Sequence, residues 1–148
     1  MKKIFAAFAL FVCIAFCSAS AENFLSVKRQ KKITPTTKIN YDFTKLNYNI
    51  ASGLLFDMLV SPDKYVNKTM KIHGQFYSEN HDGMRSFAIL IWDLTGCCPT
   101  GMMVAPLSGM KYPNDFPKND EFVTVTGFLE KIKSGDDESL YLVAEKWE

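Results

Sequence analysis

Two adjacent cysteines, Cys97 and Cys98, stand in the segment DLTGCCPTG that begins at Asp93. Thiolates and carboxylates bind zinc, and thiolates also bind copper(I). Adjacent Cα atoms across a trans peptide lie ~3.8 Å apart, below the ~4.4–6.8 Å that disulfides usually span, so a bond between these sulfurs is strained. Three interpretations stay open at this point: a zinc or copper site, a vicinal disulfide or redox couple, and packed free thiols.

The backbone conformation around the two cysteines decides whether both sulfurs can bind the same metal ion. In a regular strand, neighbouring side chains point to opposite faces. Gly96 and Pro99 flank the pair, however, and predict a turn or bulge in which both thiols converge. The sequence also contains two histidines that could bind a metal ion, although no C-x-x-C or H-x-x-x-H spacing is present. The candidate metal or redox residues are Asp93, Cys97, Cys98, His73 and His81.

Catalytic motifs are missing from the sequence. It contains no G-x-S-x-G elbow and no Walker glycine loop. A cysteine nucleophile needs a histidine or a helix N-terminus beside it, and the chain has 2 histidines. We therefore expect that the protein is not an enzyme.

The first 21 residues predict an export signal. A start containing Lys2 and Lys3 is followed by an apolar run of 13 residues and then by the small residues of Ala19-Ser20-Ala21. The run is shorter than the roughly 20 residues that span a membrane. We expect cleavage after Ala21 and an exported product, either periplasmic or extracellular.

The remaining 127 of the 148 residues suit one domain. Once Lys2 and Lys3 are removed, 15 basic residues face 16 acidic ones, which gives a net charge of −1. This balance argues against nucleic acid as a partner. Residues 22–48 are interpreted as a flexible basic spacer. Weak contact with an anionic membrane surface or wall is expected from Lys28, Arg29, Lys31 and Lys32.

Residues 49–148 predict one β-rich domain that opens with a helix. Ala51, Leu54, Leu55, Met58 and Leu59 form one apolar helical stripe, and Pro62 ends it. Alternating or fully apolar segments then predict strands. These segments are 69–77, 86–94, 101–107, 121–133 and 140–147.

Two glycines suggest how these strands are arranged. Gly74 and Gly127 interrupt long strands, where glycine costs stability unless the strand bends sharply or another backbone comes close. Five strands with such bends predict an OB-like Greek-key barrel. Its helix precedes the first strand, and the proline-containing segment 108–120 takes the place where OB-folds usually carry their helix. The fold class is therefore mostly β.

An aromatic surface is the other candidate site. OB-folds bind ligands on a barrel face, often by stacking on aromatic rings. In a nearly neutral exported protein, such a face suits a protein, peptide or saccharide partner. We expect a non-enzymatic binding or interaction module, with a metal-binding or thiol-redox protein as the alternative. The candidate binding face consists of Tyr77, Phe122, Phe128, Tyr141 and Trp147.

Several motifs carry a resemblance that covers residues 42–145. They are the PxxYxxK segment at Pro62, the KxxGxFY strand at Lys71, the Asp93-x-x-x-Cys97-Cys98 segment, and the VTVTG strand. The chain resembles a family of small exported bacterial proteins of OB-like fold, and the C-terminal domain of a membrane protein family found beside predicted permeases. The resemblance implies the fold and export, and no activity. The family pattern favours glycine where Asn67 stands here.

Overall fold

The structure is a computed structural model and describes residues 23–28, 36–134 and 136–148. Residues 1–21, where the export signal is predicted, and Arg29, Lys31 and Lys32 lie outside these ranges. The described elements, in chain order, are β1 (Asn23–Phe24), β2 (Tyr41–Asp42), the 3-10 helix η1 (Phe43–Lys45), α1 (Tyr48–Val60), the 3-10 helix η2 (Pro62–Lys64), β3 (Thr69–His81), β4 (Met84–Trp92), β5 (Pro99–Pro106), β6 (Phe122–Ser134) and β7 (Asp137–Trp147).

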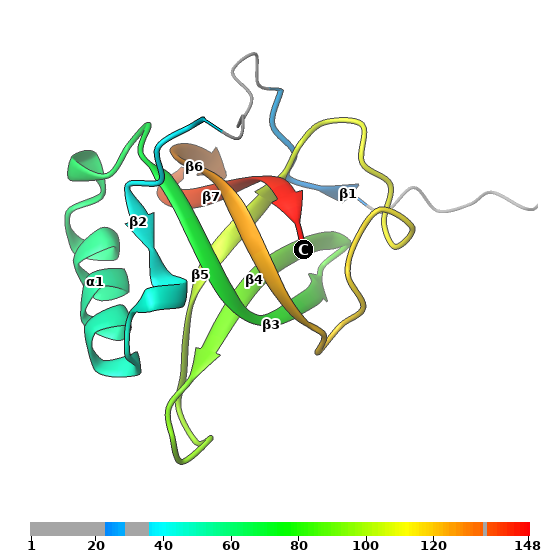
Figure 1. Ribbon diagram of the computed structural model, residues 1–148. Coiled ribbons are helices and arrows are strands. Elements are labelled where there is room, and N and C mark those ends of the chain that lie inside the picture. Colours follow the sequence, from blue (N-terminus) through cyan, green and yellow to red (C-terminus); the bar gives the residue numbers. More distant parts are fainter. Residues whose placement is uncertain (1–22, 29–35, 135) are drawn as a thin grey trace, which may run out of the picture.

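The strands form a closed barrel with a helix at its side (Figure 1). The strand order is β1-β4-β5-β7-β6-β3-β2, and an additional pairing of β4 with β3 closes the ring of five long strands. β5 pairs with β7 in parallel, whereas the other barrel pairs are antiparallel. This confirms the predicted OB-like barrel with a preceding helix.

The barrel closes because β3 pairs with two different strands along its length. Its first half, up to Gln75, pairs with β6, and its second half, from Gln75 onward, pairs with β4. Gly74 lies at the change of partner, where a Cβ atom would collide with the carbonyl oxygen of Leu90. Gly127 lies at a bulge in β6, and a Cβ there would collide with the carbonyl oxygen of Val143. Both glycines allow two backbones to approach closely.

Left-handed backbone conformations occur on both sides of β3. Asp82 and Gly83 have φ values of 50° and 82° between β3 and β4, as a two-residue hairpin turn of type I′ requires. Asn67, just before β3, has a φ of 63°. Asparagine tolerates this conformation better than most residues with a side chain, so the chain adopts it before β3 without a glycine.

Helix α1 packs one side of its surface on the barrel. Ala51, Leu55 and Met58 are buried, but Leu59 is 62% exposed. The inclusion of Leu59 in the buried stripe was therefore wrong, because α1 contacts the barrel over a narrower arc than its apolar residues cover. Phe56 and Val60 are also exposed. Among the described residues, no helix is long and apolar enough to cross a membrane.

Another part of the core is filled by aromatic rings from the β5–β6 connection. Phe116 stacks on Phe87 with ring centroids 4.6 Å apart, and Tyr112 lies 5.8 Å from the same ring. Segment 108–120 contains no helix, as its sequence predicts. Aromatic side chains thus fill the space at which a helix would otherwise pack.

The prediction of a flexible spacer over residues 22–48 is wrong for its described parts. β1 pairs with β4, and β2 pairs with β3. Phe24 contacts Phe87 with ring centroids 5.5 Å apart, and Phe43 is buried. The physical reason is that a few aromatic residues in this otherwise polar segment supply enough apolar surface to dock it on the barrel. Lys28 remains exposed.

We expect Gly127→Ala to lower the free energy of unfolding by about 1–3 kcal/mol, because the added methyl group forces the β6 and β7 backbones apart. Denaturant unfolding measures the change. The matched control is Gly53→Ala in α1, where a Cβ meets nothing within 4 Å and where alanine stabilises a helix by up to about 1 kcal/mol. Equal midpoints for the two variants would contradict the role assigned to Gly127.

Candidate functional site

The β4–β5 loop is organised by the carboxylate of Asp93. The backbone N–H of Cys97 donates to Asp93 Oδ1 at 3.1 Å, and the hydroxyl of Thr95 donates to both carboxylate oxygens at 2.9 Å. The backbone N–H of Gly96 donates to the carbonyl of Asp93 at 3.0 Å, and Gly96 has a φ of 71°. An aspartate that accepts these bonds folds the chain back on itself.

This turn brings the two cysteine side chains to the same side of the chain. The Sγ atoms lie 3.0 Å apart, and Cys97 Sγ lies 3.9 Å from Asp93 Oδ2. Ligand atoms of Asp93, Cys97 and Cys98 all lie within 4.8 Å of one another. Both thiols are free and exposed. The interpretation as packed thiols is therefore wrong, because the loop projects beyond the barrel (Figure 1).

The three groups of this cluster influence one another's protonation. The hydrogen bond between the two thiols, together with a bond from Thr95, lowers the pKa of Cys97. The same bond, burial and the charge of Asp93 raise the pKa of Cys98. Hydrogen bonds from Thr95 and from the loop backbone lower the pKa of Asp93. Cys97 is thus the thiol that loses its proton first.

Neither histidine belongs to the group of ligand atoms around Asp93. His81 is the last residue of β3, and its Nε2 is 3.3 Å from a carboxylate oxygen of Asp82 in the following turn. His73 lies in the middle of β3. Its Nδ1 is 3.0 Å from Thr124 Oγ1, and its ring stacks on Phe122. The structure therefore assembles three of the five candidate residues and separates the two histidines from them.

The five aromatic residues predicted to form a binding face are also divided. Phe128 is 1% exposed, and its inclusion was wrong, because a buried ring cannot contribute to a binding face. Trp147 packs edge-on against Phe76 in the core, with ring centroids 5.6 Å apart. Tyr141 is half-buried. Of the five, Tyr77 and Phe122 are exposed, at 37% and 62%.

A pocket of about 480 Å³ opens beside the loop. It lies where β3 and β4 separate beyond the pair Gln75–Leu90. The indole N–H of Trp92 donates to Gln75 Oε1 at 2.7 Å across this gap. The 3-10 helix η1 and the start of α1 provide the opposite wall. The lining residues are Phe43, Thr44, Leu46, Tyr48, Ala51, Lys71, His73, Ile91, Trp92 and Thr124.

Tyr48 connects the pocket with the cysteine loop. It lines the pocket, and its hydroxyl donates to the carbonyl oxygen of Cys98 at 2.8 Å. Burial, followed by the nearby charges of Asp93 and the two cysteines, raises the pKa of Tyr48. Tyr48, Trp92 and Lys71 are not among the candidate site residues that were predicted from the sequence. The sequence feature that could have indicated one of them is the position of Trp92 directly before Asp93.

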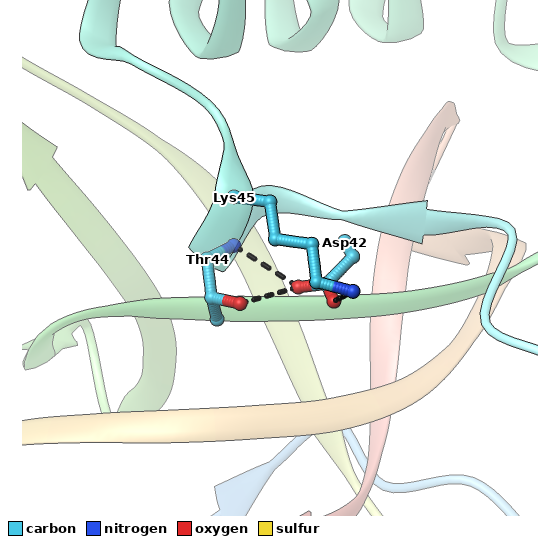
Figure 2. A network of polar contacts seen from close by, with 3 residues as sticks. All are labelled: Asp42, Thr44 and Lys45. Carbon is cyan, nitrogen blue, oxygen red and sulfur yellow. Dashed lines mark hydrogen bonds and ion pairs between the residues drawn. The ribbon is translucent and has the colours of Figure 1, made fainter.

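The η1 wall of the pocket is held by a small polar network (Figure 2). Asp42 caps η1 by accepting from the backbone N–H of Thr44 at 3.2 Å. The Thr44 hydroxyl also donates to Asp42, and the Lys45 ammonium lies 3.0 Å from its carboxylate. The Thr44 hydroxyl and then Lys45 lower the pKa of Asp42. This cap holds η1 in place, and two of its residues, Phe43 and Thr44, line the pocket.

We expect Asp42→Asn to lower the free energy of unfolding by about 1 kcal/mol near neutral pH, because the cap loses its charge. The folded-state pKa of Asp42 is lowered, so its stabilisation is present above the unfolded-state pKa of about 3.9 and is lost as the pH falls through the folded-state value. The difference between variant and parent, measured by denaturant unfolding, should therefore shrink in acid. Asp136→Asn, at an exposed position, is the control. A difference that stays constant in acid would contradict this role.

We expect limiting iodoacetamide near neutral pH to alkylate Cys97 before Cys98, because the lower pKa gives Cys97 more thiolate. Peptide mass mapping locates the label. Cys98→Ala removes the hydrogen-bond partner that lowers the pKa of Cys97, so this pKa should rise and the alkylation of Cys97 should slow several-fold. In the reciprocal variant, Cys97→Ala, Cys98 should react faster than it does in the parent. Equal labelling of both cysteines in the parent would contradict the assigned hydrogen bond.

No protein-family model matches this sequence, and comparison with curated proteins found no significant match. The family resemblance noted in the sequence therefore stays a prediction, although the barrel that it implied is present.

Proposed function

We propose that this protein is an exported, non-enzymatic OB-like module that binds a thiophilic divalent metal ion through Asp93, Cys97 and Cys98. Zinc is the ion that these ligands favour. The observation that carries the proposal is the convergence of two exposed thiols and one carboxylate within 4.8 Å. Export rests on the sequence of residues 1–21. A binding role is favoured over catalysis because neither histidine is among the clustered ligand atoms.

The distances in the cluster are close to those of a tetrahedral zinc site. With Zn–S bonds of about 2.3 Å, tetrahedral geometry places two sulfurs about 3.8 Å apart. The sulfurs lie 3.0 Å apart and Cys97 Sγ lies 3.9 Å from Asp93 Oδ2, so small side-chain rotations suffice. The carboxylate also favours zinc over copper(I), since copper(I) prefers soft ligands.

Three protein ligands leave a fourth tetrahedral position open. Such a position takes water or a donor atom from another molecule. Exposure of the loop and an incomplete ligand set favour a readily exchanged ion over a structural one. The barrel core is built without the loop, so metal binding is not needed for folding.

We expect native mass spectrometry to find one zinc ion per chain after incubation with zinc chloride. Cys97→Ser should weaken binding by at least about tenfold, since a ligand is lost. Binding should also weaken as the pH falls, because protons compete for the thiols. His81→Gln is the matched control, because it changes a potential ligand outside the cluster and should leave affinity unchanged. An unaltered mass after incubation with zinc chloride would refute the proposed site.

A thiol-redox couple is the second candidate function, favoured by the 3.0 Å contact between the sulfurs. Closing the bond would release two protons and pass two electrons to an oxidant such as a small disulfide. Denaturing alkylation of protein treated with oxidised glutathione separates the candidates. For the chain cleaved after Ala21, two alkyl groups would exclude the redox couple, whereas no alkyl group and no added glutathione mass would show that the pair closes.

A further inference from the structure

The pocket beside the loop has a wall suited to a flat apolar group. Phe43, Leu46, Ala51 and Ile91 supply apolar surface, and Trp92 contributes an indole ring. The bond from the indole N–H to Gln75 fixes the orientation of that ring. Trp92 is 38% exposed, so part of the indole is free to stack on a ligand. A volume of about 480 Å³ lies within the range usual for small-molecule sites.

One wall of the pocket carries a positive charge. Lys71 is the charged residue among those that line it. It is half-buried and forms no ion pair with any residue in the described part of the chain. Lys71 contributes to the lowered pKa of Glu148, but less than Lys146 does. Lys71 is therefore available to a ligand.

His73 adds a directional group beside Lys71. The two residues lie on the same side of β3, because their positions differ by two. His73 Nδ1 is 3.0 Å from the hydroxyl of Thr124, so its other ring nitrogen remains for a ligand. Tyr48, which lines the pocket from α1, adjoins the acidic cysteine loop. A negative group would thus lie at the Lys71 end, away from Asp93.

We propose that this pocket binds a small organic anion with a flat apolar body, an aromatic carboxylate. The ring would lie against Trp92, and the carboxylate would meet Lys71 and His73. A neutral saccharide also stacks on tryptophan, but it could not form an ion pair with the ammonium group of Lys71. This site is independent of metal binding at the neighbouring loop.

Isothermal titration calorimetry with naphthalene-2-carboxylate and its neutral analogue naphthalene-2-carboxamide tests the proposal. We expect the carboxylate to bind at least about tenfold more tightly than the carboxamide. This is the difference in affinity that one charge-assisted hydrogen bond contributes. Lys71→Met should reduce this preference to within about twofold, whereas Lys133→Met, at an exposed position near the far end of β6, should leave it unchanged. Trp92→Leu should weaken both compounds.

Amide chemical shifts locate the bound probe. Shifts on β3 near Lys71 and on η1 would support the pocket, and shifts confined to the exposed apolar side of α1 around Phe56 would overturn it. Equal affinity for the two compounds, or no saturable binding, would also overturn the proposal. Repeating the titration with Cys97→Ser separates the two sites, because loss of the metal ligand should leave carboxylate affinity intact.

Discussion

The architecture depends on one strand that pairs with two neighbours in succession. β3 pairs with β6 up to Gln75 and with β4 from there on. The change of partner requires the backbones to approach closely at Gly74, where any side chain would meet the carbonyl of Leu90. Because β3 and β4 diverge beyond this point, a gap opens that η1 and α1 cover only in part. The pocket is a consequence of how the barrel closes.

The cysteine loop depends on a second, local constraint. Asp93 accepts bonds from Thr95 and from the backbone of Cys97, and these bonds replace the extended geometry that would separate adjacent side chains. The same carboxylate is then positioned beside the sulfurs, where it would be the third ligand of the proposed metal site. Asp93 shapes the turn and would also contribute to its proposed chemistry.

The loop and the pocket meet at two residues. Tyr48 at the start of α1 bonds to the carbonyl of Cys98, and Trp92 at the end of β4 directly precedes Asp93. The rigid parts of the fold, a helix terminus and a strand end, therefore hold both candidate sites. Sites that are anchored in this way keep their geometry better than sites carried by a free loop.

The sequence by itself determined the five long strands, the leading helix and the turn around Gly96, because period-two patterns, apolar helical spacing and glycine act locally. It also identified Asp93, Cys97 and Cys98, which are close in the chain. Only the tertiary structure decided that Phe128 is covered, that the histidines lie apart from the thiols, and that Lys71 shares a pocket with Trp92. These outcomes depend on which distant segments pack together, and no local pattern encodes that.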